Sequence, residues 1–393
     1  MRPTLVFALV AFVASPGVAQ IPDVPTFGRD WTSLSFPWIT WGPTEGLTAG
    51  LFHAQINQLG YGEWEAPEPY RAAASLDGHI SASGSKRLEL AFRAPKWVQE
   101  WRYVVTLEGR RDARERYFGI GNANVYDDAN ETDAVPHFYR SDNTRWIARS
   151  EVQRRVIGPL RLLAGLHLER WRIDTLSGPS QLAQDLAAGA DPSIGQGTTD
   201  ASARIGLVFD TRNDEPAPTR GLLIEAIVGI ADSGIISAMS YTRTTVSATG
   251  YLPALPNLTI AARVLGQTMS GGPRLGSYAL IEASDRPFRG IGSAESHRAI
   301  PAQRLLDADK LLANLDVRHA FFAFPTLFRV TAIGFLDAAR VFPAGEFSVT
   351  TEDLMVGGGV GLVAQFFRTG ILGTTAGIGP DGVVWFFHTR WPF

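Results

Sequence analysis

Cysteine is absent from all 393 residues of the sequence. The chain therefore has neither a disulfide framework nor a thiolate metal site. After the first 20 residues, no apolar run reaches the roughly 18 to 20 residues that a transmembrane helix needs. The net charge of −3 excludes a strongly basic nucleic-acid-binding protein. These absences leave a protein without covalent cross-links, membrane helices or a nucleic-acid partner.

Catalytic signatures are missing as well. The seven histidines are scattered, and no His-Glu-x-x-His, Gly-x-Ser-x-Gly, P-loop or dinucleotide-binding glycine pattern occurs. A hydrolase could assemble a site from distant loop residues such as Asp133 and His137. The acidic loop 127–133 could hold a divalent cation, but it lacks the EF-hand pattern and is typical of a solvated loop. We expect no enzyme, no metal site and no cofactor.

The first 19 residues are typical of a secretory signal peptide. Arg2 supplies a positive charge, residues 5–14 form a short apolar segment, and residues 17–19 offer small side chains for cleavage. Residues 20–30 then form a short linker with two prolines. The sequence thus predicts an exported chain whose domain covers residues 31–393.

The remaining chain is apolar without helical apolar blocks. It contains 40 glycines and 10 tryptophans, and its mean hydropathy is zero. From Trp31 onward, segments with two-residue alternation are separated by Gly, Pro, Asn and Asp clusters. About 16 strands result, with short turns alternating with long loops such as 270–306. This pattern predicts an all-β fold, a transmembrane antiparallel β-barrel of about 16 strands.

The last eleven residues, Val383 to Phe393, show the alternation most clearly. One face carries the aromatic residues Trp385, Phe387, Trp391 and Phe393, and the lower half of the other face is polar. A strand between lipid and water needs such a pattern. We expect these aromatics to form a C-terminal barrel signal on the closing strand. The alternative is an amphipathic edge strand of a soluble protein.

Several motifs resemble the BamA/TamA outer-membrane assembly-factor superfamily, whose barrel is also called the bacterial surface antigen domain. Asp210-Thr211-Arg212 followed by Pro218-Thr219-Arg220-Gly221 resembles its D-T-R…P-T-R-G hairpin. Arg289-Gly290 resembles its R-G loop motif, and the elements around Asp316 and Asp337 resemble the two strands that follow. Two departures are Ala339 in place of a glycine, and 283–285 in place of the usual Gly-Gly.

The resemblance implies that the long loop folds into the lumen and lays Arg289 against Asp316 and Asp337. Arginine suits this role because its planar fork binds carboxylates and stays charged. Gly290 would allow a tight turn. These four residues would form a latch with a structural or gating role. Without the resemblance, Arg289 would be a solvated loop residue.

Family members that handle nascent barrel proteins carry periplasmic POTRA domains, for which the ten or so residues before Trp31 leave no room. The sequence therefore resembles barrel-only members. Two functions follow. One is insertion or translocation of proteins or lipids at the outer membrane through a weak seam between the first and last strands. The other is a passive pore or structural barrel. Expected partners are outer-membrane lipid, lipopolysaccharide and client outer-membrane or secreted proteins.

Overall fold

The computed structural model describes residues 31–42, 44–63, 65–324 and 327–393. The expected signal peptide and linker, residues 1–30, lie outside the described residues. One 16-stranded antiparallel sheet dominates the rest. Its strands are β1 (Trp31–Gly42), β2 (Gly46–Asn57), β3 (Ala72–Ser81), β4 (Lys86–Val98), β5 (Trp101–Arg116), β6 (Arg140–Ile157), β7 (Leu160–Thr175), β8 (Thr198–Asp210), β9 (Gly221–Ala231), β10 (Tyr241–Leu255), β11 (Leu258–Gly271), β14 (Asp309–Phe324), β15 (Phe328–Phe342), β16 (Met355–Phe366), β17 (Gly370–Gly379) and β18 (Gly382–His388).

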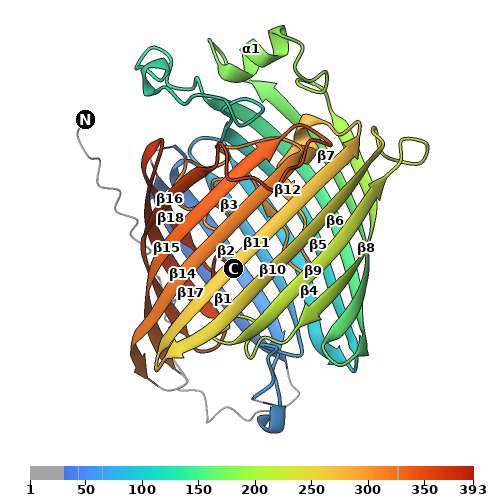
Figure 1. Ribbon diagram of the computed structural model, residues 1–393, viewed down its shortest axis with the longest axis vertical. Coiled ribbons are helices and arrows are strands. Elements are labelled where there is room, and N and C mark those ends of the chain that lie inside the picture. Colours follow the sequence, from blue (N-terminus) through green and yellow to red (C-terminus); the bar gives the residue numbers. More distant parts are fainter. Residues whose placement is uncertain (1–30, 43, 64, 325–326) are drawn as a thin grey trace.

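Each strand pairs with its neighbour in the chain, and the sheet curls into a barrel (Figure 1). Short turns gather at one rim, for example residues 99–100 between β4 and β5 and residues 158–159 between β6 and β7. The long loops lie at the other rim, where the loop between β7 and β8 carries α1 (Gln181–Ala187). This arrangement is the one expected of an outer-membrane barrel. In the described part of the chain, no helix has the length and apolarity needed to cross a membrane.

Strand β7 illustrates how alternation sorts the side chains. His167 and Glu169 are buried, whereas the neighbouring Leu166 and Leu168 are 62% and 42% exposed. Charged side chains therefore face the lumen, and apolar side chains face outward around the barrel. A water-soluble protein would have the opposite arrangement. An apolar exterior around a polar interior is the arrangement expected of a transmembrane barrel.

The long loop between β11 and β14, residues 272–308, folds into the lumen. We call it the plug loop. It contains α2 (Leu275–Tyr278) and a small hairpin of β12 (Leu280–Ile281) and β13 (Phe288–Arg289). Two further short helical turns, Tyr61–Glu63 and Asp128–Asn130, lie in other connections. The plug loop confirms the expectation of one long loop inside the barrel.

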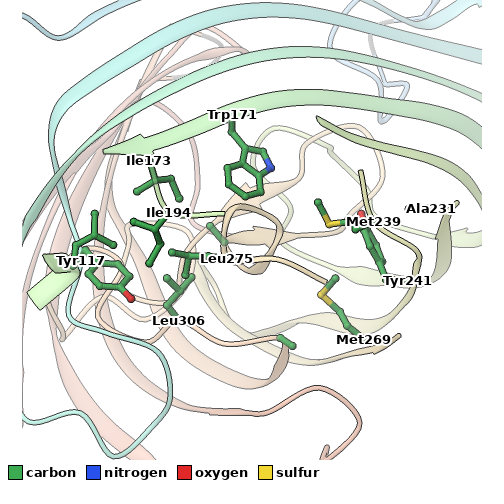
Figure 2. Packing of buried hydrophobic residues seen from close by; sticks show 13 residues of the cluster. Tyr117, Trp171, Ile173, Ile194, Ala231, Met239, Tyr241, Met269, Leu275 and Leu306 are labelled. Atoms are coloured by element: carbon green, nitrogen blue, oxygen red, sulfur yellow. The ribbon is translucent and has the colours of Figure 1, made fainter. Parts of the chain in front are cut away.

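Apolar packing holds the plug loop against the wall (Figure 2). Leu275 and Leu306 of the plug loop meet Trp171 and Ile173 of β7. The indole of Trp171 lies so close to Gly276 that a Cβ there would overlap the ring. The lumen therefore contains a packed apolar core as well as its charged groups.

The sheet order begins at β1 and ends at β18, and within the described residues no backbone ladder joins these two strands. Strand β18 has only seven residues, whereas β1 has twelve. In the described part of the chain, the edges formed by the first and last strands are therefore not joined by the backbone hydrogen bonds that link every other pair of neighbours, and we call the opening between these two edges the seam.

Candidate functional site

Arg298 joins the plug loop to two strands of the wall through a fully buried ionic contact. Its Nε and Nη2 donate to the two carboxylate oxygens of Asp337 on β15, at 2.9 and 2.7 Å, and Nη2 also lies 2.6 Å from Asp316 on β14. All three side chains are fully buried. Asn314 donates to Asp337 at 2.7 Å. One planar guanidinium thus bridges two buried carboxylates, as its fork geometry allows, and Arg318 supplies the second positive charge by donating to Asp316 at 2.9 Å.

The prediction that Arg289 fills this position is wrong. Arg289 instead donates to both carboxylate oxygens of Glu169 on β7, at 3.1 and 2.7 Å. Asp316 and Asp337 do face the lumen, as expected, but their arginine is nine residues further along the chain. Both arginines belong to the same loop, and only the path of that loop through the lumen decides which one reaches which wall.

Two features of the plug loop set this path. Gly290 has φ of 75°, a conformation that glycine adopts without strain, so it makes the tight turn expected of it. Further along, Ala299 packs onto glycines of β16 and β17: a Cβ on Gly357 would lie 2.5 Å from that of Ala299, and one on Gly377 would overlap the Arg298 carbonyl. The glycines of the wall therefore let the plug-loop backbone at Arg298 and Ala299 lie close to β16 and β17. In this position the Arg298 side chain reaches β14 and β15.

Acidic residues of the plug loop provide two more attachments that the sequence motifs did not indicate. Glu282 accepts from Arg149 on β6 and from Arg204 on β8, the latter at 2.8 Å. Asp285 accepts from Arg93 on β4 at 2.7 Å. Alternating charges on β6 could have signalled inward-facing arginines, but nothing in the sequence pairs them with the loop. The plug loop is thus attached to strands on several sides of the barrel.

The D-T-R…P-T-R-G hairpin forms a compact turn between β8 and β9. Arg212 clasps Asp210 through Nε and Nη2 at 2.9 and 2.8 Å. Across the turn, the Asn213 side chain accepts from the backbone of Thr219 and Arg220, at 3.0 Å each. Gly221 has φ of 107°, and a Cβ there would overlap the Thr211 carbonyl. Within the hairpin, Pro218 is buried and Arg220 is exposed. The hydrogen bonds of Asp210 and Asn213 lie within the hairpin itself and fix the shape of the turn.

The C-terminal aromatics divide into two pairs. Trp385 and Phe387 lie on β18 and are 61% and 51% exposed, as expected of lipid-facing residues. Trp391 and Phe393 were expected on the same face, and this prediction is wrong. Strand β18 ends at His388, whose Nδ1 lies 2.7 Å from the Arg390 carbonyl oxygen in the turn that follows.

Beyond that turn, the final residues enter the lumen. Trp391 is buried, and its ring centroid lies 4.6 Å from the Arg318 guanidinium carbon. Arg318 also donates to a terminal carboxyl oxygen of Phe393 at 3.0 Å, and Arg263 lies 4.9 Å from the Phe393 ring centroid. Cation–π attraction and a charge-assisted hydrogen bond therefore hold the C-terminus inside.

Chemically, these contacts are ion pairs, hydrogen bonds and ring stacking. Among the residues that the structure describes, no group of His, Asp and Glu side chains is placed to hold a metal ion. Asp133 and His137, the residues considered for a distant-loop hydrolase, lie in the loop between β5 and β6 at the long-loop rim. These contacts are suited to holding the plug loop and the C-terminus in place inside the barrel.

Comparisons with known proteins agree with this architecture. The Omp85 superfamily domain matches residues 72–282. BamA from Haemophilus ducreyi lacking POTRA domains 1–3 superposes with a TM-score of 0.55 at 12% identity, over 98% of this chain and 74% of that one. CdiB from Escherichia coli gives 0.58 at 12% identity, over 97% and 66%. CdiB from Acinetobacter baumannii gives 0.51 at 10%, over 97% and 65%.

The chain spans about two thirds of the length of the CdiB structures and about three quarters of the BamA structure. At these identities the superpositions establish a shared fold. No curated protein sequence matches the chain.

Proposed function

This chain belongs to the Omp85 superfamily, and from that premise we propose that it inserts or translocates client proteins, or lipids, at the outer membrane of a Gram-negative bacterium. The role is not enzymatic. Contact with outer-membrane lipid and lipopolysaccharide, and export through cleavage of residues 1–19, are parts of this proposal.

The observation that supports it is the seam between β1 and β18, which lacks a backbone ladder in the described part of the chain. Unpaired strand edges present rows of N–H and C=O groups that can pair with another chain. In the bilayer such groups are costly unless they find partners. An entering strand would satisfy both edges, so the seam is the place where a client segment would be accepted.

The plug loop complements this role. A barrel of 16 strands is wide enough for an aqueous channel, and Arg298, Arg289 and Glu282 fasten the loop across it. A client strand can then enter laterally between β1 and β18 while the plug loop blocks the lumen. A passive pore would need a clear lumen, so the fastened plug loop favours the insertion role over the pore.

The test is quantitative proteomics of outer membranes from cells with and without the gene. Because the chain has no cysteine, the seam can be bridged selectively, with one cysteine at Ser33 or Ser35, one at Val384 or Phe386, and a reducible thiol-reactive linker that spans the two unpaired strands. We expect deletion to remove a defined set of proteins, the cross-linked seam variant to leave them missing, and reduction of the linker to restore them.

A matched control places the cysteines at Thr244 and Thr268, which are register partners on β10 and β11. This cross-link joins strands that are already paired, so it should support assembly in both redox states. An outer membrane unchanged by deletion would point instead to the pore or structural barrel. Full assembly with a locked seam would contradict entry between β1 and β18.

A further inference from the structure

Between the plug loop and the rim of short turns, the lumen retains a cavity of ≈ 260 Å³. Its lining comes from inward-facing wall residues, from the β8–β9 hairpin and from the C-terminus. The wall contributes Tyr103, Arg161 and Tyr251, the hairpin contributes Asp210 and Glu215, and the C-terminus contributes Phe393. The cavity thus lies among charged and aromatic groups, and the packed plug loop separates it from the long loops.

One arginine in this lining differs from the other buried arginines. The described residues with buried arginine side chains are Arg145, Arg149, Arg161, Arg204, Arg243, Arg263, Arg298, Arg304 and Arg318. Eight of them donate a side-chain hydrogen bond to a protein oxygen. Within the described residues, Arg161 donates none. Its side chain is 7% exposed, and its nearest carboxylate oxygens, on Asp210 and Glu68, lie 3.9 and 4.0 Å away.

Those two carboxylates are already engaged by other cations. Asp210 is clasped by Arg212. Glu68 accepts from Arg102 at 3.1 Å and lies 3.8 Å from Lys96.

Arg102 also binds Glu215. The cluster therefore contains four cations, Lys96, Arg102, Arg161 and Arg212, against three carboxylates, Glu68, Asp210 and Glu215. Four minus three leaves one surplus positive charge in the cluster, and Arg161 is the member that donates no hydrogen bond to a described residue. A buried guanidinium without a hydrogen-bond acceptor is disfavoured.

We propose that the cavity binds a small oxyanion, a phosphate or carboxylate group, on the Arg161 guanidinium. The planar fork of arginine matches both groups in bidentate geometry, and one negative charge balances the surplus of the cluster. Tyr103 and Tyr251 also line the cavity, and in the described part of the chain no hydrogen bond to a protein acceptor occupies their hydroxyls. A volume of ≈ 260 Å³ suits an ion or a head-group fragment and excludes a whole lipid.

The direct test uses the full chain purified in detergent with inorganic phosphate as the probe. We expect saturable binding by isothermal titration calorimetry, weakened at least tenfold in Arg161→Gln and partly retained in Arg161→Lys. The control is Arg172→Gln, because Arg172 lies on the same strand towards the long-loop rim, is exposed, and pairs with Asp174. Its binding should equal that of the unaltered chain.

A second measurement does not depend on any variant folding. Crystals soaked in selenate should show anomalous scattering next to the Arg161 guanidinium. Tighter binding of glycerol phosphate than of inorganic phosphate would identify the anion as a lipid head group, and equal binding would identify a free ion. The proposal is overturned if the unaltered chain shows no saturable binding, if Arg161→Gln binds as well as the unaltered chain, or if selenate leaves the cavity empty.

Discussion

At the scale of single residues, this lumen depends on arginine and its carboxylate partners. Arg298 shows why position matters more than type, because Arg289 lies in the same loop and has the same chemistry but pairs elsewhere. The two arginines differ in whether their carboxylate partners keep another cation when the arginine is removed. Loss of Arg298 leaves Asp337 fully buried without its ion-pair partner, whereas Asp316 keeps Arg318 at 2.9 Å. Loss of Arg289 leaves Glu169 still bound by Arg145 at 2.9 Å.

We therefore predict that Arg298→Ala lowers the free energy of unfolding by about 3–5 kcal/mol, the cost of leaving buried charge without its partner. Arg289→Ala should cost about 1–2 kcal/mol, because a charged partner remains. Urea unfolding in lipid vesicles measures both, and limited proteolysis of residues 272–308 reports loosening of the plug loop. Equal effects of the two substitutions would contradict the assignment of Arg298 as the principal latch.

A second residue-scale prediction concerns Glu45, in the turn between β1 and β2. Burial opposes its ionisation, but hydroxyl donors on Ser83, Ser85 and Ser81 outweigh this and hold its pKa below the ordinary value of 4.5. Ser83 donates to Glu45 at 2.5 Å and Ser81 at 2.9 Å. Because the folded pKa is depressed, this stabilisation is present above pH 4.5 and is lost as pH falls through the folded pKa.

Hydrogen exchange at Ala82 and Ser83 should therefore accelerate as the pH is lowered below about 4.5, after correction for the intrinsic rate. Glu45→Gln should remove this pH dependence. Glu65→Gln, an exposed residue at the opposite rim, is the control and should behave as the unaltered chain. A pH response that persists in Glu45→Gln would show that another group is responsible.

At the scale of elements, the strands follow their alternation and the turns follow their glycines. Gly221 is the clearest case, because its φ of 107° and its contact with the Thr211 carbonyl both require the absence of a Cβ. Asp210 and Arg212 then close the same turn with two hydrogen bonds. The hairpin is therefore specified by residues close together in the chain, which explains why its motif can be recognised from the sequence.

Gly221→Ala is expected to destabilise the barrel by about 1–3 kcal/mol through backbone strain, with a further cost for displacing the Thr211 carbonyl. Gly334→Ala is the matched control, because Gly334 lies in β15 and a Cβ there would meet nothing within 4 Å. Thermal loss of the compact band in unheated gel electrophoresis compares the two. An equal midpoint for both variants would show that the hairpin tolerates a side chain.

At the scale of the whole molecule, the barrel places apolar residues outside and charged residues inside, and the plug loop fills the interior. The attachments of this loop on β4, β6, β7, β8, β14 and β15 act together. Removal of one pair should loosen the loop, whereas removal of the whole segment should empty much of the lumen.

We predict that the unaltered chain in planar bilayers is mostly closed with brief openings. Replacement of residues 280–306 by a short Gly-Ser linker should raise the steady conductance several-fold, because a 16-stranded barrel then has a free channel. Replacement of residues 232–236, an exposed segment of a long-rim loop, is the control and should leave conductance unchanged. A large steady conductance in the unaltered chain would contradict a fastened plug.

The sequence by itself determined the class of fold, since two-residue alternation and the absence of helical apolar runs are local properties that depend on neighbours along the chain. It also determined that Asp316 and Asp337 face inward, because a lipid-facing carboxylate is too costly. It could not determine that Arg298 meets them, that Glu282 joins Arg149 and Arg204, or that Trp391 and Phe393 turn into the lumen. Those contacts join segments far apart in sequence, and only the path of the plug loop and the position of the lumen arginines decide which charges and rings meet.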